Sequence, residues 1–123
     1  MARILVVDDN PPVRELLCLV LQRAGYEIAE AGDGIEGVRM FHQQPADLVI
    51  MDIFMPGKEG FEAIRELRHD FPGVKIIAIT GGGAGMSPSH RLKMAQEFGV
   101  VDVMRKPLDI DKFLHAIEKA LSE

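Results

Sequence analysis

The sequence predicts an α/β fold in three layers, with a five-stranded parallel sheet between two layers of helices. Three observations indicate this fold. Short apolar runs alternate with longer amphipathic segments, the links between them are short, and hydrophobic residues make up 47% of the 123 residues against 27% charged. Such alternation is typical of strand–helix–strand units, because parallel strands need a crossover connection. The length suits one domain, and we expect residues 1–123 to form it.

The first strand and helix are the most clearly marked. Arg3–Val7 is a continuous apolar run of the kind buried on both faces of a sheet. We expect Asn10 to cap the following helix, Pro11 and Pro12 to occupy its first turn, and Gly25 to end it. The apolar positions of this helix recur at helical spacing: Val13, Leu16, Leu17, Val20, Leu21 and Ala24.

The alternation continues to the end of the chain. Further strands are expected over 27–30, 47–51, 74–79 and 101–104. Each is followed by a helix, whose apolar stripe is marked in turn by Ile35, Val38 and Phe41; by Phe61, Ile64 and Leu67; by Leu92, Ala95 and Phe98; and by Ile110, Phe113, Leu114, Ile117 and Leu121. Five strand–helix pairs with short links imply helices on both faces of the sheet.

Composition excludes several classes of function. Fourteen Lys and Arg against 19 Asp and Glu give a net charge of −5, which argues against binding to nucleic acid or to an anionic membrane. The apolar runs are too short to span a bilayer, and Asp8 and Asp9 interrupt the stretch after Met1 where a signal peptide would continue. We therefore expect a cytoplasmic domain.

The single cysteine and the four histidines give no sign of a metal site. Cys18 alone forms neither an internal disulfide nor a cysteine-based zinc site, and we interpret it as an apolar helix residue. His42, His69, His90 and His115 lack metal-ligand spacing and are expected at the surface.

Polar side chains follow four of the expected strands. They are Asp8 and Asp9, Asp52, Thr80 and Lys106, and all fall at the carboxyl edge of the sheet, where such folds bind ligands. Neighbouring carboxylates repel unless a cation compensates, and oxygen ligands suit Mg²⁺. A lysine and a hydroxyl beside them would stabilise a transferring phosphoryl group, with a carboxylate as nucleophile. The pattern predicts metal-assisted aspartyl phosphorylation without selecting the acceptor.

In this order and placement, these residues resemble the receiver domain of bacterial two-component response regulators over nearly the whole chain. The matching features are the pair Asp8–Asp9, the segment 52–57 (Asp-Ile-Phe-Met-Pro-Gly) with Gly60, Thr80, and Asp102 followed by Lys106–Pro107. The resemblance implies a flavodoxin-like, doubly wound sheet of order 2-1-3-4-5.

The resemblance also implies a metal site and a phosphoacceptor. Asp52 would take a phosphoryl group from a histidine of a sensor kinase or a phosphotransfer protein. Asp9, Asp52 and the backbone carbonyl of Phe54 would bind Mg²⁺, and Asp8 would assist through water.

Two further residues have implied roles. Lys106 would pair with the phosphoryl oxygens, and its peptide bond to Pro107 would be cis. Thr80 would be the switch hydroxyl that moves toward phosphorylated Asp52. The chemistry would be limited to self-phosphorylation and autodephosphorylation, without turnover of a substrate.

The implied partners include a downstream protein or an output domain, either separate or part of a longer regulator. They would bind the surface of the fourth helix, fifth strand and fifth helix, within 91–98, 101–105 and 112–119. We expect no direct nucleic-acid or membrane binding by this domain, and a monomer or weak homodimer.

The chain departs from the family pattern at two places. Val103 stands where an aromatic residue is usual, so switching through an aromatic flip is not expected. The glycine-rich stretch 81–89 is longer than expected after Thr80. One hypothesis is a loop that becomes ordered on phosphorylation or partner binding, and the other is a tolerated surface insertion.

Two other functions are compatible with parts of the sequence. Residues 32–37 fit the dinucleotide-binding pattern G-x-G-x-x-G, but Asp33 and Glu36 would oppose a pyrophosphate. The alternative to a receiver is a Mg²⁺-dependent aspartyl-phosphate phosphatase or phosphotransferase acting on an external substrate. Such an enzyme would need a cap large enough to exclude water, and no segment is long enough to supply one.

Overall fold

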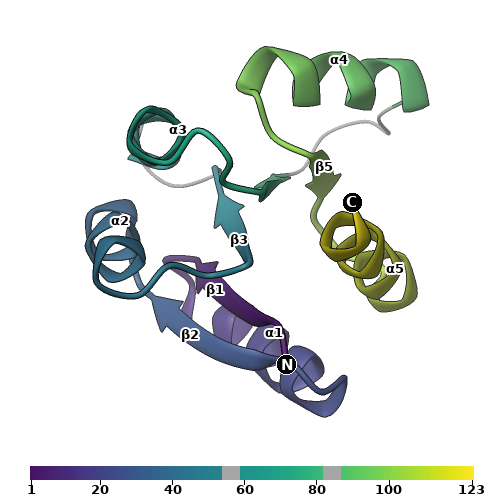
Figure 1. The fold of residues 1–123 in the computed structure, drawn as a ribbon. Helices are drawn as coiled ribbons and strands as arrows, with labels where there is room; N and C mark the ends of the chain where they lie inside the picture. The colour runs from purple at the N-terminus through teal and green to yellow at the C-terminus, as the bar shows by residue number, and fades with distance from the viewer. Residues whose placement is uncertain (54–58, 82–86) are drawn as a thin grey trace.

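The computed structural model describes residues 1–53, 59–81 and 87–123, which form a three-layer α/β/α domain (Figure 1). One parallel sheet has the strand order β2-β1-β3-β4-β5. The strands are β1 (Arg3–Val7), β2 (Glu27–Ala31), β3 (Leu48–Asp52), β4 (Ile76–Thr80) and β5 (Asp102–Arg105). The helices are α1 (Pro11–Arg23), α2 (Gly34–Gln43), α3 (Glu59–Asp70), α4 (Pro88–Phe98) and α5 (Ile110–Ser122). The predicted fold class and sheet order are confirmed.

Two apolar layers hold the helices to the sheet. Ile4 and Val6 of β1 belong to the layer under α1 and α5, whereas Leu5 and Val7 belong to the layer under α2, α3 and α4. Successive strand residues point to opposite faces, so β1 needs apolar residues at every position. All four of these side chains are at most 2% exposed.

The register of the sheet brings the carboxyl ends of four strands to one edge. Val7 is level with Met51, Asp52 with Ile79, and Thr80 with Arg105. The residues that follow β1, β3, β4 and β5 therefore meet at this edge, as the sequence predicted.

The predicted ends of α1 are confirmed. The Asn10 side chain accepts a hydrogen bond from the Val13 backbone N–H at 3.2 Å, and Pro11 and Pro12 open the helix. Gly25 follows the helix with a φ of 97°, a left-handed conformation that favours glycine.

Several positions of the predicted apolar stripes are exposed instead of buried. Leu16 is 52% exposed, Ile35 78%, Phe61 37% and Leu92 60%. The sheet covers only part of each helix surface, and in α1 that part centres on Leu17, Cys18 and Leu21. Leu16 lies about 100° around the helix from Leu17, which turns it toward solvent.

Among the described residues, no helix is both long enough and apolar enough to cross a membrane.

Candidate functional site

Three carboxylates gather at the carboxyl edge of the sheet. Asp8 follows β1, Asp9 comes next, and Asp52 is the last residue of the neighbouring strand β3. One carboxylate oxygen from each lies within 4.8 Å of the others. Asp8 and Asp52 are 1% exposed, whereas Asp9 is exposed. Among the residues that the structure describes, these three carboxylates form the one group whose spacing would allow them to hold a metal ion.

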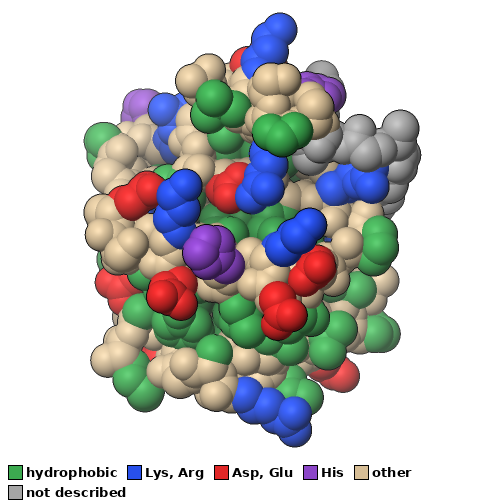
Figure 2. Space-filling view, turned by 90° about the vertical axis from the view of Figure 1, so that its right-hand side faces the viewer, with side chains coloured by type: hydrophobic (Ala, Val, Ile, Leu, Met, Phe, Trp, Pro, Cys, Tyr) green, Lys and Arg blue, Asp and Glu red, His purple; other side chains and the backbone are tan. Residues whose placement is uncertain are grey.

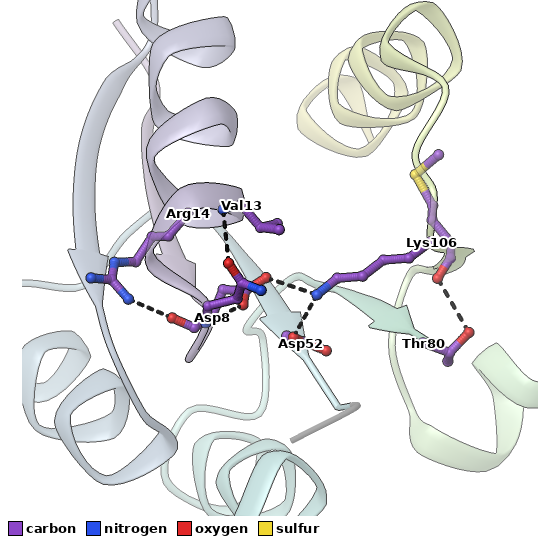
Figure 3. Close-up of polar contacts among 8 residues, drawn as sticks. Asp8, Val13, Arg14, Asp52, Thr80 and Lys106 are labelled. Atoms are coloured by element: carbon purple, nitrogen blue, oxygen red, sulfur yellow. Dashed lines mark hydrogen bonds and ion pairs between the residues drawn. The ribbon is translucent and has the colours of Figure 1, made fainter. Parts of the chain in front are cut away.

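Lys106 links two of these carboxylates. Its Nζ lies 2.9 Å from Oδ2 of Asp52 and 3.2 Å from Oδ2 of Asp8 (Figure 3). Burial disfavours the lysine charge, but the hydrogen bond and the attraction of Asp52, together with Asp8, outweigh burial and raise the pKa of Lys106. The Lys106 backbone N–H donates to the Thr80 carbonyl at 2.9 Å, which joins the loop to β4. The predicted cis peptide bond between Lys106 and Pro107 is confirmed.

Opposing effects act on the pKa of Asp8 within the cluster. Burial raises its pKa most, the Asn10 backbone N–H lowers it, the charge of Asp52 raises it again, and Lys106 lowers it; the net shift is upward. Its Oδ1 accepts from the Asn10 N–H at 2.8 Å. Its buried Oδ2 has no hydrogen bond of acceptable geometry, although Lys106 lies within ion-pair distance. A buried oxygen of this kind, beside two other carboxylates, fits a hard divalent cation.

Thr80 lies at the same edge, but its hydroxyl points away from the carboxylates. Its Oγ1 donates to the Met104 carbonyl of β5 at 3.5 Å, at the long limit of a hydrogen bond (Figure 3). The structure thus brings together Asp8, Asp9, Asp52 and Lys106, and places Thr80 beside them in another contact. Phe54 lies outside the described residues, as do residues 82–86 of the glycine-rich stretch.

Arg14 also lies at the site, although no pattern in the sequence indicates a role for it. Its Nη1 donates to the backbone carbonyl of Asp8 at 2.7 Å, and its Nε donates to Glu30 of β2 at 3.0 Å. Arg14 lies outside the apolar stripe predicted for this helix. The one available signal was its place, one helical turn after the capping Asn10 and close to the acidic pair.

The structure agrees with the sequence-based interpretation of Cys18 and of the four histidines. Cys18 is buried, and burial, followed by the effect of Glu30, raises the pKa of its thiol to about 11. The predicted surface positions of the histidines are confirmed at His42, His69, His90 and His115.

The glycine pattern 32–37 serves packing and capping. Asp33 caps α2 and accepts from the Glu36 backbone N–H at 2.7 Å, which places a carboxylate where a pyrophosphate would bind. A Cβ on Gly37 would lie 2.8 Å from a methyl group of Val7, so this glycine allows a close helix–sheet approach.

The face formed by α4, β5 and α5 carries charges of both signs (Figure 2). The Arg91 guanidinium binds Asp102 through two bonds of 2.7 and 2.5 Å, and this carboxylate, against the opposing effect of burial, raises the pKa of Arg91. A groove of about 360 Å³ lies between this pair and Lys112, His115 and Lys119 of α5. Val103 is completely buried beneath this face.

Comparisons with known proteins agree with this geometry. The family described as response regulator receiver domain matches residues 4–118. Protein PilH of Pseudomonas aeruginosa is 33% identical, with 99% of each chain covered. The CAI-1 autoinducer sensor kinase/phosphatase CqsS of Vibrio cholerae is 40% identical over 94% of this chain, and the transcriptional regulatory protein GlrR of Escherichia coli is 34% identical over 99%. This chain spans 17% of the length of CqsS and 27% of that of GlrR.

Solved structures show the same architecture. The response regulator protein TrrA from Thermotoga maritima, in complex with Mg²⁺ and BeF, has a TM-score of 0.81 and 37% identity, with 98% of this chain and 99% of that chain covered. A CheY-like receiver domain protein from Methanospirillum hungatei has a TM-score of 0.85 and 27% identity, with 99% and 94% covered.

Proposed function

This chain belongs to the response regulator receiver domain family and acts in two-component signalling, and we propose that Asp52 is the residue that accepts the phosphoryl group. The observation that carries this proposal is the contact of Asp52 with Lys106 inside the group of three carboxylates. Lys106 Nζ lies nearer to Asp52, at 2.9 Å, than to Asp8, at 3.2 Å, and would pair with a phosphoryl oxygen on Asp52 from this position.

The donor set supports Mg²⁺ as the cofactor. Asp8, Asp9 and Asp52 supply only carboxylate oxygens, and the unsatisfied Oδ2 of Asp8 faces the cluster. Asp9 and Asp52 would bind the ion directly with the carbonyl of Phe54, and Asp8 would assist through water. When bound, Mg²⁺ would neutralise charge on the transferring phosphoryl group.

The chain's own residues then account for the transfer. An oxygen of Asp52 forms a bond to phosphorus as the bond from phosphorus to the donor nitrogen or oxygen breaks. Lys106 stabilises the charge on the phosphoryl oxygens from its position 2.9 Å from Asp52. Thr80 can exchange its 3.5 Å hydrogen bond to Met104 for one to the phosphoryl group at little cost, and this exchange would move the end of β4.

A pocket beside the site supports docking of a histidine phosphodonor. About 440 Å³ in volume, it is mostly apolar, and Lys106 lines it, so a partner bound there sits next to Asp52. The other lining residues come from α1 and from the segment that joins β5 to α5: Val13, Leu16, Leu17, Pro107, Leu108 and Ile110. Leu16, exposed at 52%, would be covered by a sensor kinase or a phosphotransfer protein.

The downstream protein or output domain would bind the face formed by α4, β5 and α5. We place the ion pair of Arg91 and Asp102 on the surface that a downstream protein or output domain contacts. The domain would work in the cytoplasm as a monomer or weak homodimer, without binding nucleic acid itself, and would modify only itself.

Intact-mass measurement after incubation with acetyl phosphate tests the proposal. The wild-type protein should gain one phosphoryl group only with Mg²⁺, and Asp52→Asn should gain none. Asp111→Asn, at an exposed acidic residue of α5, is the matched control and should react like the wild type. An adduct that persists in Asp52→Asn would overturn the assignment, and steady-state hydrolysis of a small phosphate ester would favour the enzyme alternative.

A further inference from the structure

Arg14 joins three elements beside the acidic site. From the fourth residue of α1, its guanidinium donates to the backbone carbonyl that follows β1 and to a carboxylate of β2. The partners are the Asp8 carbonyl at 2.7 Å and Glu30 at 3.0 Å (Figure 3 shows the first contact). Its side chain is 19% exposed.

The bond to Asp8 falls on the peptide that connects the two acidic residues. The carbonyl of Asp8 and the N–H of Asp9 share one rigid plane, so a donor that fixes this carbonyl also fixes the direction in which the chain enters Asp9. The Asp8 N–H donates to the Ala31 carbonyl at 3.2 Å, and its Oδ1 accepts from the Asn10 N–H. With Arg14 on the carbonyl, Asp8 is held at three atoms, and its Oδ2 lies in ion-pair contact with Lys106 beside Asp52.

Glu30 holds the arginine in turn. Because it binds Nε while Nη1 binds Asp8, the guanidinium uses two of its donors in one plane and cannot rotate without losing a partner. A lysine has a single nitrogen and cannot reproduce this pair of directions.

We propose that Arg14, held by Glu30, is a positioning residue for the metal site: it fixes the peptide between Asp8 and Asp9 so that both carboxylates face Asp52. This inference rests on the proposed function, because it concerns the same cation. Partners of this kind commonly change metal affinity by about tenfold or more when they are removed.

The chain offers a matched control. Arg3 of β1 also pairs with a glutamate of β2, since its Nη1 lies 3.0 Å from Glu27. The side-chain exposures are 19% and 53%, against 19% and 50% for Arg14 and Glu30. Arg3 lies at the opposite end of β1 from the acidic site. The two pairs should therefore contribute similarly to stability, and only one should affect metal binding.

Titration calorimetry with Mg²⁺ tests the proposal on the full chain. Arg14→Met should weaken Mg²⁺ binding by about tenfold, and Arg3→Met should leave it within about twofold of the wild type. Arg14→Lys should recover only part of the affinity, and it provides the comparison if Arg14→Met does not fold. In the metal-free protein, hydrogen exchange at the Asp9 and Asn10 amides should be faster in the Arg14 variants alone.

The outcomes separate this inference from the proposed function. Equal Mg²⁺ affinity in the Arg14 and Arg3 variants, with unchanged exchange at Asp9, would overturn the positioning role while wild-type phosphorylation remains intact. A wild-type protein that neither binds Mg²⁺ nor gains a phosphoryl group would overturn the proposed function itself, and this inference with it.

Discussion

Replacing Lys106 with methionine should destabilise the metal-free protein through its buried carboxylates. The substitution keeps the apolar stem but removes the cation that lies 2.9 Å from Asp52 and 3.2 Å from Asp8, both 1% exposed. Removing one partner of a buried ion pair costs about 3–5 kcal/mol. Because the Lys106 side chain is itself 24% exposed, we expect the lower end, a loss of about 3 kcal/mol in the free energy of unfolding.

The loss should depend on pH and on Mg²⁺. The pKa of Asp8 is already raised in the folded protein, chiefly by burial, and without Lys106 it rises further. A group with a raised folded-state pKa contributes most below its unfolded pKa, and the contribution is lost as the pH rises through the folded value. The variant should therefore recover stability as the pH falls from 7 toward 5. Mg²⁺ at 100 times its dissociation constant stabilises any protein that keeps the acidic site by about 2.7 kcal/mol. Because Lys106 no longer competes for the carboxylates, the variant should bind Mg²⁺ more tightly than the wild type, and its loss relative to the wild type should shrink at a fixed Mg²⁺ concentration.

Urea unfolding followed by circular dichroism measures these effects, since the chain has no tryptophan. Lys75→Met is the control, because Lys75 donates to backbone oxygens away from the acidic site, of Ala120 at 2.9 Å and Glu123 at 2.5 Å. Its loss should be smaller, about 1–2 kcal/mol, and should not respond to Mg²⁺. A Lys106→Met variant whose loss is the same at pH 7 and pH 5, with and without Mg²⁺, would refute the electrostatic reasoning.

A glycine substitution tests the packing beside the site, and a labelling reaction tests the burial of Cys18. Gly60→Ala would place a Cβ 2.7 Å from the Ile53 Cα and 2.8 Å from the Asp52 carbonyl; it should lower the free energy of unfolding by about 1–2 kcal/mol and slow phosphorylation. Gly73→Ala, whose Cβ meets open space, should change stability by less than about 1 kcal/mol, and equal urea midpoints for the two variants would contradict this reasoning. Because the pKa of Cys18 is raised from near 9 to about 11, its thiolate should be about a hundredfold rarer at pH 8 than that of a free thiol, so dithionitrobenzoate should label the folded protein slowly. The same shift predicts a loss of stability as the pH rises from about 9 to 11, and labelling at the rate of the unfolded chain would count against it.

The sequence predicted the strands well because β1, β3 and β4 are buried on both faces and need apolar residues at every position. Each predicted strand lies within two residues of the observed one. The helix faces were less predictable. Leu16, Ile35 and Leu92 all fit helical spacing, yet each is more than half exposed. Spacing identifies an apolar stripe, but the part of a helix that the sheet covers depends on how the helix is rotated in the tertiary structure.

In the site, too, some features could be predicted from the sequence and others depend on the tertiary structure. The gathering of Asp8, Asp9 and Asp52 could be predicted because they follow neighbouring strands of a parallel sheet. That Lys106 reaches two of them depends on the path of the loop after β5, and spacing in the sequence does not give that path. Arg14 was missed because its partners are a backbone carbonyl and a residue of another strand, and neither leaves a pattern in the sequence.

The strand order also separates the site residues by how firmly their backbones are held. β1 and β3 each have a hydrogen-bonded neighbour on both sides, so a shift at Asp8 or Asp52 would disturb two ladders at once. Among the strands that the structure describes, β5 lies at the edge of the sheet and pairs with β4 alone, and Lys106 directly follows it. The backbones of Asp8 and Asp52 are therefore held on both sides, whereas Lys106 follows a strand that is held on one side. A phosphoryl group on Asp52 would therefore displace β5 more readily than β1 or β3, and β5 also carries Asp102, the ion-pair partner of Arg91.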